Sequence, residues 1–108
     1  MKKGEIWIVA LPGSGGHEQG GLRPAIVIAD TGATVAVVIP CTSNPHARRF
    51  PHTFAIEASK KNGLVIPTVA LILQIRAVDK KRLQKKIGVI EPSLLARIDA
   101  TLRELLSL

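Results

Sequence analysis

Aromatic residues are almost absent from this chain. Among its 108 residues only Trp7, Phe50 and Phe54 are aromatic, and there is no Tyr. A hydrophobic core must therefore be built mainly from Val, Ile and Leu. A surface that stacks successive nucleic-acid bases on several aromatic rings is excluded, because three such residues are too few to build it.

Cysteine pairs and long apolar runs are also lacking. Cys41 is the single cysteine, which excludes an internal disulfide and is typical of proteins from a reducing compartment. No apolar run approaches the ~20 residues that a membrane-spanning helix needs. The basic start Met1-Lys2-Lys3 is followed at once by Glu5, and the next apolar run ends at Pro12, unlike a signal peptide. These features predict a cytoplasmic protein with no membrane partner.

Acidic residues are outnumbered almost two to one. The chain has 15 Lys and Arg against 8 Asp and Glu, a formal net charge of +7. This balance favours a polyanionic partner, either nucleic acid or an acidic protein, although a basic surface can also serve solubility alone. The length indicates one domain covering 1–108, so any active site must be assembled from loops on a single scaffold.

Short apolar runs separated by turn residues predict a mainly β protein. Turns are expected at 30–32 and 60–63, and one helical turn capped by Asp79 is expected at 79–84. β-Branched and alternating patterns predict strands at 6–11, 24–29, 34–39 and 53–58, within 64–75 beside a bend at Pro67, and at 87–90.

The last part of the chain predicts an amphipathic helix that opens at Glu91-Pro92-Ser93. Its apolar residues recur at helical spacing and form one face: Leu94, Leu95, Ile98, Leu102, Leu105 and Leu106. Several short strands followed by such a helix indicate a small β-barrel with a helix packed on it.

Two predicted loops carry most of the reactive side chains. The first, 12–22, contains five glycines and leads into Arg23-Pro24, and the second is 40–51. Each meets a strand end, where side chains and backbone N–H groups can converge on a ligand. Their candidate residues are His17, Glu18, Gln19 and Arg23 in or beside the first loop, and Thr42, Ser43, Asn44, Arg48 and Arg49 in the second.

These residue types suit RNA cleavage without a metal ion. Such cleavage needs a base for the 2′-OH, a proton for the 5′-oxygen, and stabilisation of charge on the phosphorane-like transition state. An Arg supplies the last through its forked donors, and a Thr or Ser hydroxyl adds a hydrogen bond. No pair of His, Cys, Asp or Glu has metal-ligand spacing, so neither a metal site nor a cofactor is predicted.

Four motifs, taken in order, resemble those of the MazF/PemK family of toxins. They are Gly4-Glu5-Ile6-Trp7, Gly16-His17-Glu18-Gln19 with Arg23-Pro24, Pro40-Cys41-Thr42-Ser43, and Gln74-Ile75-Arg76-Ala77-Val78-Asp79. The likeness continues through Lys80-Lys81-Arg82-Leu83 and Ile87-Gly88 into the C-terminal helix. Each motif alone is weak, but four in register at similar spacing over essentially the whole chain are strong.

The resemblance implies the SH3-like barrel of CcdB/Kid/MazF-type toxins and a homodimer. It also implies sequence-selective, metal-independent cleavage of single-stranded RNA, including mRNA, which leaves a 2′,3′-cyclic phosphate and a free 5′-OH. The expected protein partner is a cognate antitoxin whose acidic or apolar C-terminal segment covers the RNA groove.

The resemblance also implies roles for individual residues. Arg23 matches the family's catalytic Arg and Thr42 its catalytic Thr, while Ser43 matches a hydroxyl that contacts RNA. His17 and Glu18 match loop positions with acid–base or RNA-binding roles. Further expected RNA contacts are Gln19, Asn44, Arg48, Arg49, Gln74 and Arg76.

The chain departs from many members of the family at Leu73. Many relatives have an Asp immediately before the Gln that Gln74 matches, and some use this Asp as the base; in one branch an Arg occupies the position of Leu71. An Asp-based mechanism is therefore excluded at this position. Either one of the two loop candidates is the base, or Arg23 with Thr42 suffices.

Local sequence alone leaves blander roles open. Arg23 can be a solvated loop residue, Thr42 and Ser43 can be turn-capping hydroxyls, and Trp7 fits core or dimer packing. Cys41 fits a small buried group better than a nucleophile. A basic cluster is either a solvated face or a track for phosphates: Lys80, Lys81, Arg82, Lys85 and Lys86.

Two other functions compete with RNA cleavage. One is a gyrase-poisoning toxin of the same barrel, of the CcdB type, which acts through C-terminal residues that often include a Trp. This chain instead ends Leu105-Leu106-Ser107-Leu108, which counts against that function. The other is an RNA-binding relative that has lost cleavage through the change at Leu73.

Overall fold

The computed structural model describes residues 1–13 and 20–108. These residues include seven antiparallel strands and one α-helix. The strands are β1 (Glu5–Leu11), β2 (Gly21–Asp30), β3 (Val35–Thr42), β4 (Thr53–Ile56), β5 (Thr68–Leu71), β6 (Arg76–Asp79) and β7 (Leu83–Val89). The helix is α1 (Pro92–Leu106), and three short 3-10 helices are η1 (Pro45–Arg49), η2 (Ile72–Gln74) and η3 (Lys80–Arg82).

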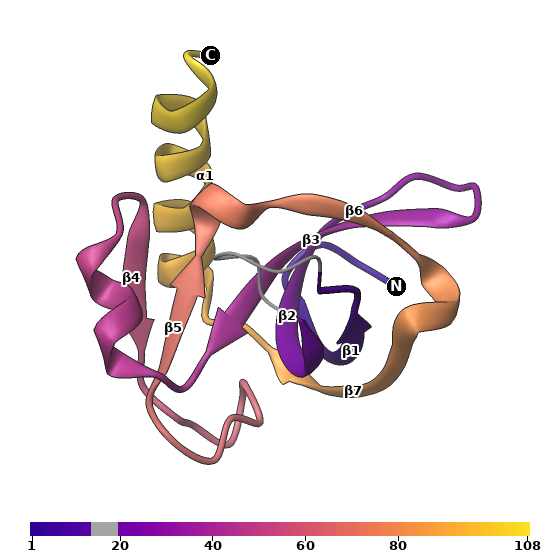
Figure 1. Cartoon of the computed structure of the whole chain (residues 1–108), viewed down its shortest axis with the longest axis horizontal. Helices are drawn as coiled ribbons and strands as arrows, with labels where there is room; N and C mark the ends of the chain where they lie inside the picture. Colours follow the sequence, from indigo (N-terminus) through magenta and orange to yellow (C-terminus); the bar gives the residue numbers. More distant parts are fainter. Residues whose placement is uncertain (14–19) are drawn as a thin grey trace.

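The strands form a single sheet in the order β4-β5-β3-β2-β1-β7, and β6 pairs separately with β3. Figure 1 shows that this sheet curves strongly, with α1 beside β4 and β5 and the tip of the β2–β3 hairpin projecting on the opposite side. The predicted class, mainly β with a C-terminal helix, is confirmed.

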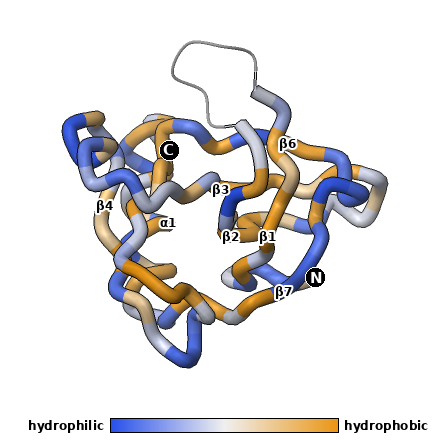
Figure 2. The backbone as a smooth tube through the Cα atoms, turned by 60° about the horizontal axis from the view of Figure 1, so that its bottom comes forward, coloured by the Kyte–Doolittle hydropathy of each residue, from blue (hydrophilic) through white to orange (hydrophobic). Residues whose placement is uncertain are grey.

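Both faces of the central strand β2 are buried. Ile26 belongs to a cluster that includes residues of α1, whereas its neighbours Ala25 and Val27 belong to a second cluster with Val9 of β1 and Val38 of β3. Successive side chains of a strand point to opposite faces, so an uninterrupted apolar run fills both clusters. Figure 2 shows β1 largely hydrophobic in the same way, while the outlying turns are largely hydrophilic.

Helix α1 closes the first of these clusters. Its Ile98 and Leu102 are buried there, and the guanidinium carbon of Arg97 lies 4.4 Å from the centroid of the Phe54 ring of β4. The predicted opening of the helix is confirmed, with Pro92 in its first turn. Leu106 is the exception to the predicted apolar face, because it is 52% exposed where the last turn extends beyond the sheet (Figure 1).

The predicted loop bounds are wrong at the two segments that carry the candidate residues. Strand β2 begins at Gly21, before Pro24, because its pairing with β1 continues to Leu11 opposite Gly21. Strand β3 continues past Pro40 to Thr42, because its last two residues pair with β5. The candidates at these positions therefore lie at strand ends, held by backbone pairing.

The second half of the chain departs further from its predicted bounds. Of the apolar run 64–75, only Thr68–Leu71 is a strand before η2 begins, and strand β7 starts at Leu83. The predicted helical turn is the 3-10 helix η3, and its predicted cap is confirmed, since the Asp79 side chain accepts a hydrogen bond from the Lys81 N–H.

A buried polar network holds the predicted turn at 60–63. The Asn62 side chain is fully buried, and its Oδ1 accepts hydrogen bonds of 3.0 Å from the backbone N–H groups of Ser59 and Leu64. Its Nδ2 donates to the Glu57 carbonyl at 2.9 Å and to Glu91 Oε1 at 3.2 Å, and the Ser59 hydroxyl donates to Glu91 Oε2 at 2.7 Å. This network ties the segment that follows the turn to the start of α1.

Acid is expected to weaken this network through Glu91. The hydrogen bond from Ser59 holds the pKa of Glu91 below its ordinary value of 4.5, although partial burial acts in the opposite direction. A carboxyl whose folded pKa is lowered stabilises the fold above its ordinary pKa, and this contribution is lost as pH falls through the folded value. Glu91→Gln should therefore lower the midpoint of thermal unfolding at pH 7 and have a much smaller effect at pH 3. A loss of equal size at both pH values would contradict the ionic role.

Candidate functional site

The register of β2 and β3 brings Arg23 and Thr42 to the same end of these two strands. Ala25 pairs with Pro40, and two residues further along each antiparallel strand are Arg23 and Thr42. Thr42 lies beyond the last residue pair of β2 with β3 and pairs with Val69 of β5. The register thus places two residues that are 19 positions apart in the chain at the same end of their strands.

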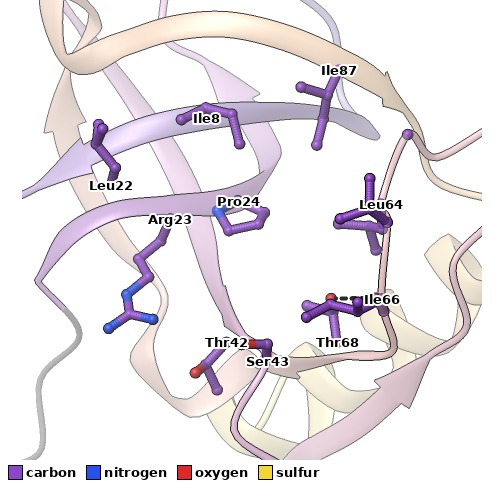
Figure 3. A pocket seen from close by; sticks show the side chains of 12 residues that line it. Ile8, Leu22, Arg23, Pro24, Thr42, Ser43, Leu64, Ile66, Thr68 and Ile87 are labelled. Carbon is purple, nitrogen blue, oxygen red and sulfur yellow. Dashed lines mark hydrogen bonds between the residues drawn. The ribbon is translucent and has the colours of Figure 1, made fainter.

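Arg23 and Thr42 lie at one side of a pocket of about 380 Å³ (Figure 3). Figure 3 shows the Arg23 side chain descending from β2 on the side where Thr42 and Ser43 lie at the end of β3. The opposite wall is formed by the segment that follows the buried Asn62 turn. The pocket is lined by Ile8, Leu22, Arg23, Pro24, Thr42, Ser43, Gly63, Leu64, Val65, Ile66, Thr68 and Ile87.

Hydrogen bonds orient both polar side chains. The Arg23 Nε–H donates to the Gly20 carbonyl at 3.2 Å, which anchors the half-buried side chain at the start of β2. The Thr42 Oγ1 accepts a hydrogen bond from the Asn44 N–H at 3.2 Å, and Thr42 is only 3% exposed. The Thr42 hydroxyl keeps its proton for donation to a ligand oxygen.

The charge of this pocket favours an anion. Among the described residues that line it, Arg23 is the only charged one and none is acidic. A guanidinium beside an apolar wall, with no carboxylate lining the same pocket, suits a ligand that joins an anionic group to an apolar one. A phosphate attached to a nucleoside has this composition.

Ser43 and Asn44 continue the site into helix η1. Both are exposed, and Asn44 Oδ1 accepts a hydrogen bond from the His46 N–H at 3.0 Å, which caps η1. The turn-capping role considered for Thr42 is thus real, since its hydroxyl oxygen accepts from Asn44. Capping and ligand contact are compatible, because the cap uses only an oxygen lone pair.

The two arginines of η1 lie in different surroundings. Arg48 lines a second pocket, of about 400 Å³, that also includes Ser43. The guanidinium carbon of Arg49 lies instead 4.7 Å from the centroid of the Phe50 ring. Both side chains are exposed, so neither is held by burial.

Gln74 and Arg76 line a different depression, together with Leu73 and Ile75. Arg76 Nη1 donates to the Pro12 carbonyl at 3.3 Å, which joins the start of β6 to the segment after β1. Leu73, where many relatives have Asp, packs against Ala47, Val69 and Leu71. The structure does not bring Gln74 or Arg76 into the lining of the Arg23 pocket.

Three candidates, His17, Glu18 and Gln19, lie outside the described residues. Over the part of the chain that the structure describes, no group of three His, Cys, Asp or Glu side chains could hold a metal ion. None of the helices described is both long and apolar enough to cross a bilayer.

Other reactive residues take structural roles. Cys41 is 1% exposed, and burial raises the pKa of its thiol to about 12, so it is not a nucleophile. Trp7 packs partly on the second apolar cluster, and its Nε1–H donates to Glu5 Oε1 at 3.0 Å. Three residues of the basic cluster have partners elsewhere in the protein: Lys80 pairs with Asp30, Lys86 pairs with Glu5, and Arg82 donates to the Ala10 carbonyl.

Sequence reasoning missed the wall formed by Leu64, Val65 and Ile66. The apolar run 64–75 was expected to hold a strand beside a bend at Pro67, with no part in the site, yet Val65 is 89% exposed and Ile66 is 50% exposed beside the pocket. The one local signal was Pro67, which breaks the run. Which face this segment presents depends on the buried Asn62 turn.

The fold is shared with solved MazF structures. The chain matches the crystal structure of MazF from Deinococcus radiodurans with a TM-score of 0.82 and 24% identity, covering 100% of this chain and 97% of that one. It matches the MazF fold in a MazE–MazF crystal structure from the same organism with a TM-score of 0.77 and 25% identity, covering 100% and 96%. The architecture is therefore that of MazF-type toxins.

Sequence relatives identify the family. The chain is 33% identical to endoribonuclease EndoA of Bacillus subtilis, over 100% of this chain and 96% of that protein. It is also 33% identical to endoribonuclease MazF of Staphylococcus epidermidis, over 94% and 88% of the two chains. Residues 2–106 match the family of PemK-like, MazF-like toxins of type II toxin–antitoxin systems. The chain belongs to this family.

Proposed function

We propose that this toxin is a metal-independent endoribonuclease that cleaves single-stranded RNA, with Arg23 and Thr42 as its catalytic pair. The observation that carries the proposal is their convergence on one pocket that has an apolar wall and, among its described residues, no acidic lining. The endoribonuclease relatives, similar over nearly the whole chain, support the same reaction.

The reaction is an intramolecular transesterification at one phosphodiester of the RNA. The 2′-oxygen attacks phosphorus, the bond to the 5′-oxygen breaks, and the products are a 2′,3′-cyclic phosphate and a 5′-OH. The guanidinium of Arg23 holds the non-bridging oxygens as charge grows on them, and the Thr42 hydroxyl donates a further hydrogen bond.

Two proton transfers accompany this reaction, and each needs a side chain or a water molecule as the proton acceptor or donor. The 2′-OH loses a proton and the departing 5′-oxygen gains one. His17 or Glu18 is proposed for this transfer, or Arg23 and Thr42 suffice with water. No carboxylate at the position of Leu73 takes part, because this side chain is aliphatic and packs against Val69 and Leu71.

The proposed RNA interface extends beyond the catalytic pair. Ser43 and Asn44 are exposed next to Thr42, and Arg48 and Arg49 follow on η1, so they are proposed to contact the RNA on that side. Gln74 and Arg76 are proposed to contact it from their separate depression. Gln19, which lies outside the described residues, is proposed as a further contact.

The partners proposed are an antitoxin and a second copy of this chain. Solved neighbours include a MazE–MazF complex and a mycobacterial endoribonuclease with its cognate antitoxin. On this chain Leu22, Val65 and Ile66 are exposed apolar residues that line the Arg23 pocket. An antitoxin segment with apolar and acidic residues would cover this rim and pair with Arg23. The cytoplasm, where mRNA is found, is the proposed location.

Incubation of the purified protein with a long single-stranded RNA in excess EDTA tests the activity. We expect fragments that begin at a common short motif, with 2′,3′-cyclic phosphate and 5′-OH ends found by end-specific ligation and sequencing. Cleavage that requires added metal would overturn the mechanism. RNA that is bound but left intact would indicate the inactive relative, and no RNA binding would overturn the proposed substrate.

A further inference from the structure

We propose that Asn62 is a site of spontaneous deamidation that the folded turn protects, and that this modification prevents an unfolded chain from folding again. The reaction needs a backbone N–H directly after the asparagine and little steric hindrance around it. The chain has two asparagines, Asn44 and Asn62. Asn44 precedes Pro45, which has no N–H, whereas Asn62 precedes Gly63, the least hindered residue type. Of the two, only Asn62 meets both requirements.

The reaction consumes one water molecule and releases ammonia. The Gly63 nitrogen loses its proton to hydroxide and bonds to Cγ of Asn62. The bond between Cγ and Nδ2 then breaks, and Nδ2 leaves as ammonia after it gains a proton from solvent. Water opens the cyclic imide that remains, at either of its two carbonyl carbons. The products have an aspartate or an isoaspartate at position 62.

Hydrogen bonds in the folded turn hold the reacting atoms. The Gly63 N–H, which must lose its proton, donates to the Ser59 carbonyl at 3.0 Å. The leaving group Nδ2 donates to Glu57 and to Glu91, as described above. Asn62 is also 0% exposed, so solvent does not reach its amide while the turn is closed. The reaction is therefore blocked in the folded turn.

Strand β7 keeps the turn from moving. Ring closure brings Cγ of Asn62 to bonding distance from the Gly63 nitrogen, which breaks these hydrogen bonds and shifts the backbone. The Lys61 carbonyl accepts a hydrogen bond from the Val89 N–H at 2.9 Å. A Cβ at Gly88 would lie only 2.3 Å from the carbonyl carbon of Asn62, so the two backbones are in close contact. Deamidation thus requires the turn to open away from β7.

The products do not fit the network that held Asn62. An aspartate places an oxygen where Nδ2 lies, and this oxygen faces two acceptors, the Glu57 carbonyl and Glu91 Oε1. Because Nδ2 and Oε1 are 3.2 Å apart, two carboxylates would meet in a buried site. An isoaspartate adds a methylene to the backbone, where Gly88 leaves no room. Chemical modification of the unfolded chain therefore makes unfolding irreversible.

Mass spectrometry of folded and unfolded protein in a mildly alkaline buffer tests the site and its protection. In guanidinium chloride we expect a mass gain of almost one dalton per chain, which peptic peptides should place at Asn62. Digestion in acid causes no deamidation of its own. In native buffer the gain should be at least about 100-fold slower, because only chains with an open turn react. No gain in guanidinium chloride overturns the site, and equal rates overturn the protection.

Ser59→Ala tests whether the turn itself provides the protection. It removes the hydroxyl that donates to Glu91 and accepts from the Asn62 N–H, and leaves Asn62 and Gly63 unchanged. The folded protein should then deamidate faster. Gly32→Ala is the control, because it strains an exposed turn that has no part in the network. A rise of the same size in both variants would mean that global unfolding limits the reaction, and would overturn protection by the turn.

Refolding tests the effect of the modification. Chains are held in guanidinium chloride at mildly alkaline pH for increasing times and then diluted, and Trp7 fluorescence measures the fraction that refolds. This fraction should fall in step with the fraction modified. Chains held in the same denaturant at mildly acidic pH, where Gly63 keeps its proton, should refold in full. Modified chains that refold with the wild-type stability overturn the effect on folding.

A variant made directly with the product residue removes any effect of the incubation. Asn62→Asp should fail to fold, or unfold at a much lower denaturant concentration than the wild type. Asn44→Asp makes the same chemical change at an exposed position, where a carboxylate can still cap η1, and should fold normally. Equal stability of Asn62→Asp and the wild type would overturn the proposed block to folding.

Discussion

Replacing Arg23 with Ala is expected to lower the rate of RNA cleavage by about 100-fold to 1000-fold, the usual cost of removing a donor that stabilises transition-state charge. Arg23 is the only charged residue among those described in the pocket lining, so no neighbour there replaces it. The loss should fall on kcat rather than KM, because charge on the phosphate oxygens grows only as the transition state forms. Single-turnover cleavage of a short RNA containing the motif measures it.

Conservative variants separate charge from geometry at the same site. Arg23→Lys keeps the charge without the fork, and should recover part of the lost rate. Thr42→Ser keeps the hydroxyl and should remain active, while Thr42→Val keeps the shape, loses the donor and should be strongly impaired. If Arg23→Ala cleaved at the wild-type rate while remaining folded, the assignment of the catalytic pair would be wrong.

Replacing Gly63 with Ala is expected to lower the free energy of unfolding by about 2–5 kcal/mol, from left-handed strain and overpacking together. Gly63 has a φ of +72°, and a Cβ there would lie 1.9 Å from the Ile87 carbonyl oxygen. Backbone atoms of β7 cannot yield as a flexible side chain would. Urea unfolding of the two proteins measures the difference.

Gly32→Ala is the control for this substitution. Gly32 has a similar φ of +77°, but a Cβ there would meet no atom within 4 Å. It should therefore cost only the left-handed strain, about 1–2 kcal/mol. Both substitutions change the unfolded chain alike, so their difference reports the contact with β7. Equal losses would show that this contact is not what requires glycine at 63.

The Gly63 substitution should also impair cleavage in protein that remains folded. Leu64 and Ile66 follow this turn in the chain and line the Arg23 pocket, so a displaced turn moves the apolar wall of the proposed RNA site. The expected signature is a raised KM for RNA, because Arg23 and Thr42 are held by β2 and β3 and not by this turn.

Local patterns in the sequence were enough for much of the fold. The apolar spacing of α1, the turn at Gly32, the Asp79 cap and the mainly β class each depend on residues within a few positions of one another. Each is confirmed, with Leu106 as the one exposed member of the helix face. The hydrogen-bonding chemistry of Arg23 and Thr42 could also be predicted from the sequence, because a guanidinium and a hydroxyl group offer the same donors in any fold. Membership of the toxin family followed from the order of the motifs.

Tertiary structure alone decided how these residues meet. Strand ends at Gly21 and Thr42 were misplaced because they are set by partner strands distant in the sequence, and periodicity within one segment does not report those partners. The exposed wall at Ile66 depends likewise on the buried Asn62 turn, and the second pocket beside Arg48 depends on η1. Sequence by itself thus determined the elements and the chemistry of this protein, whereas long-range backbone pairing determined the site, because a pocket exists only between segments that folding brings together.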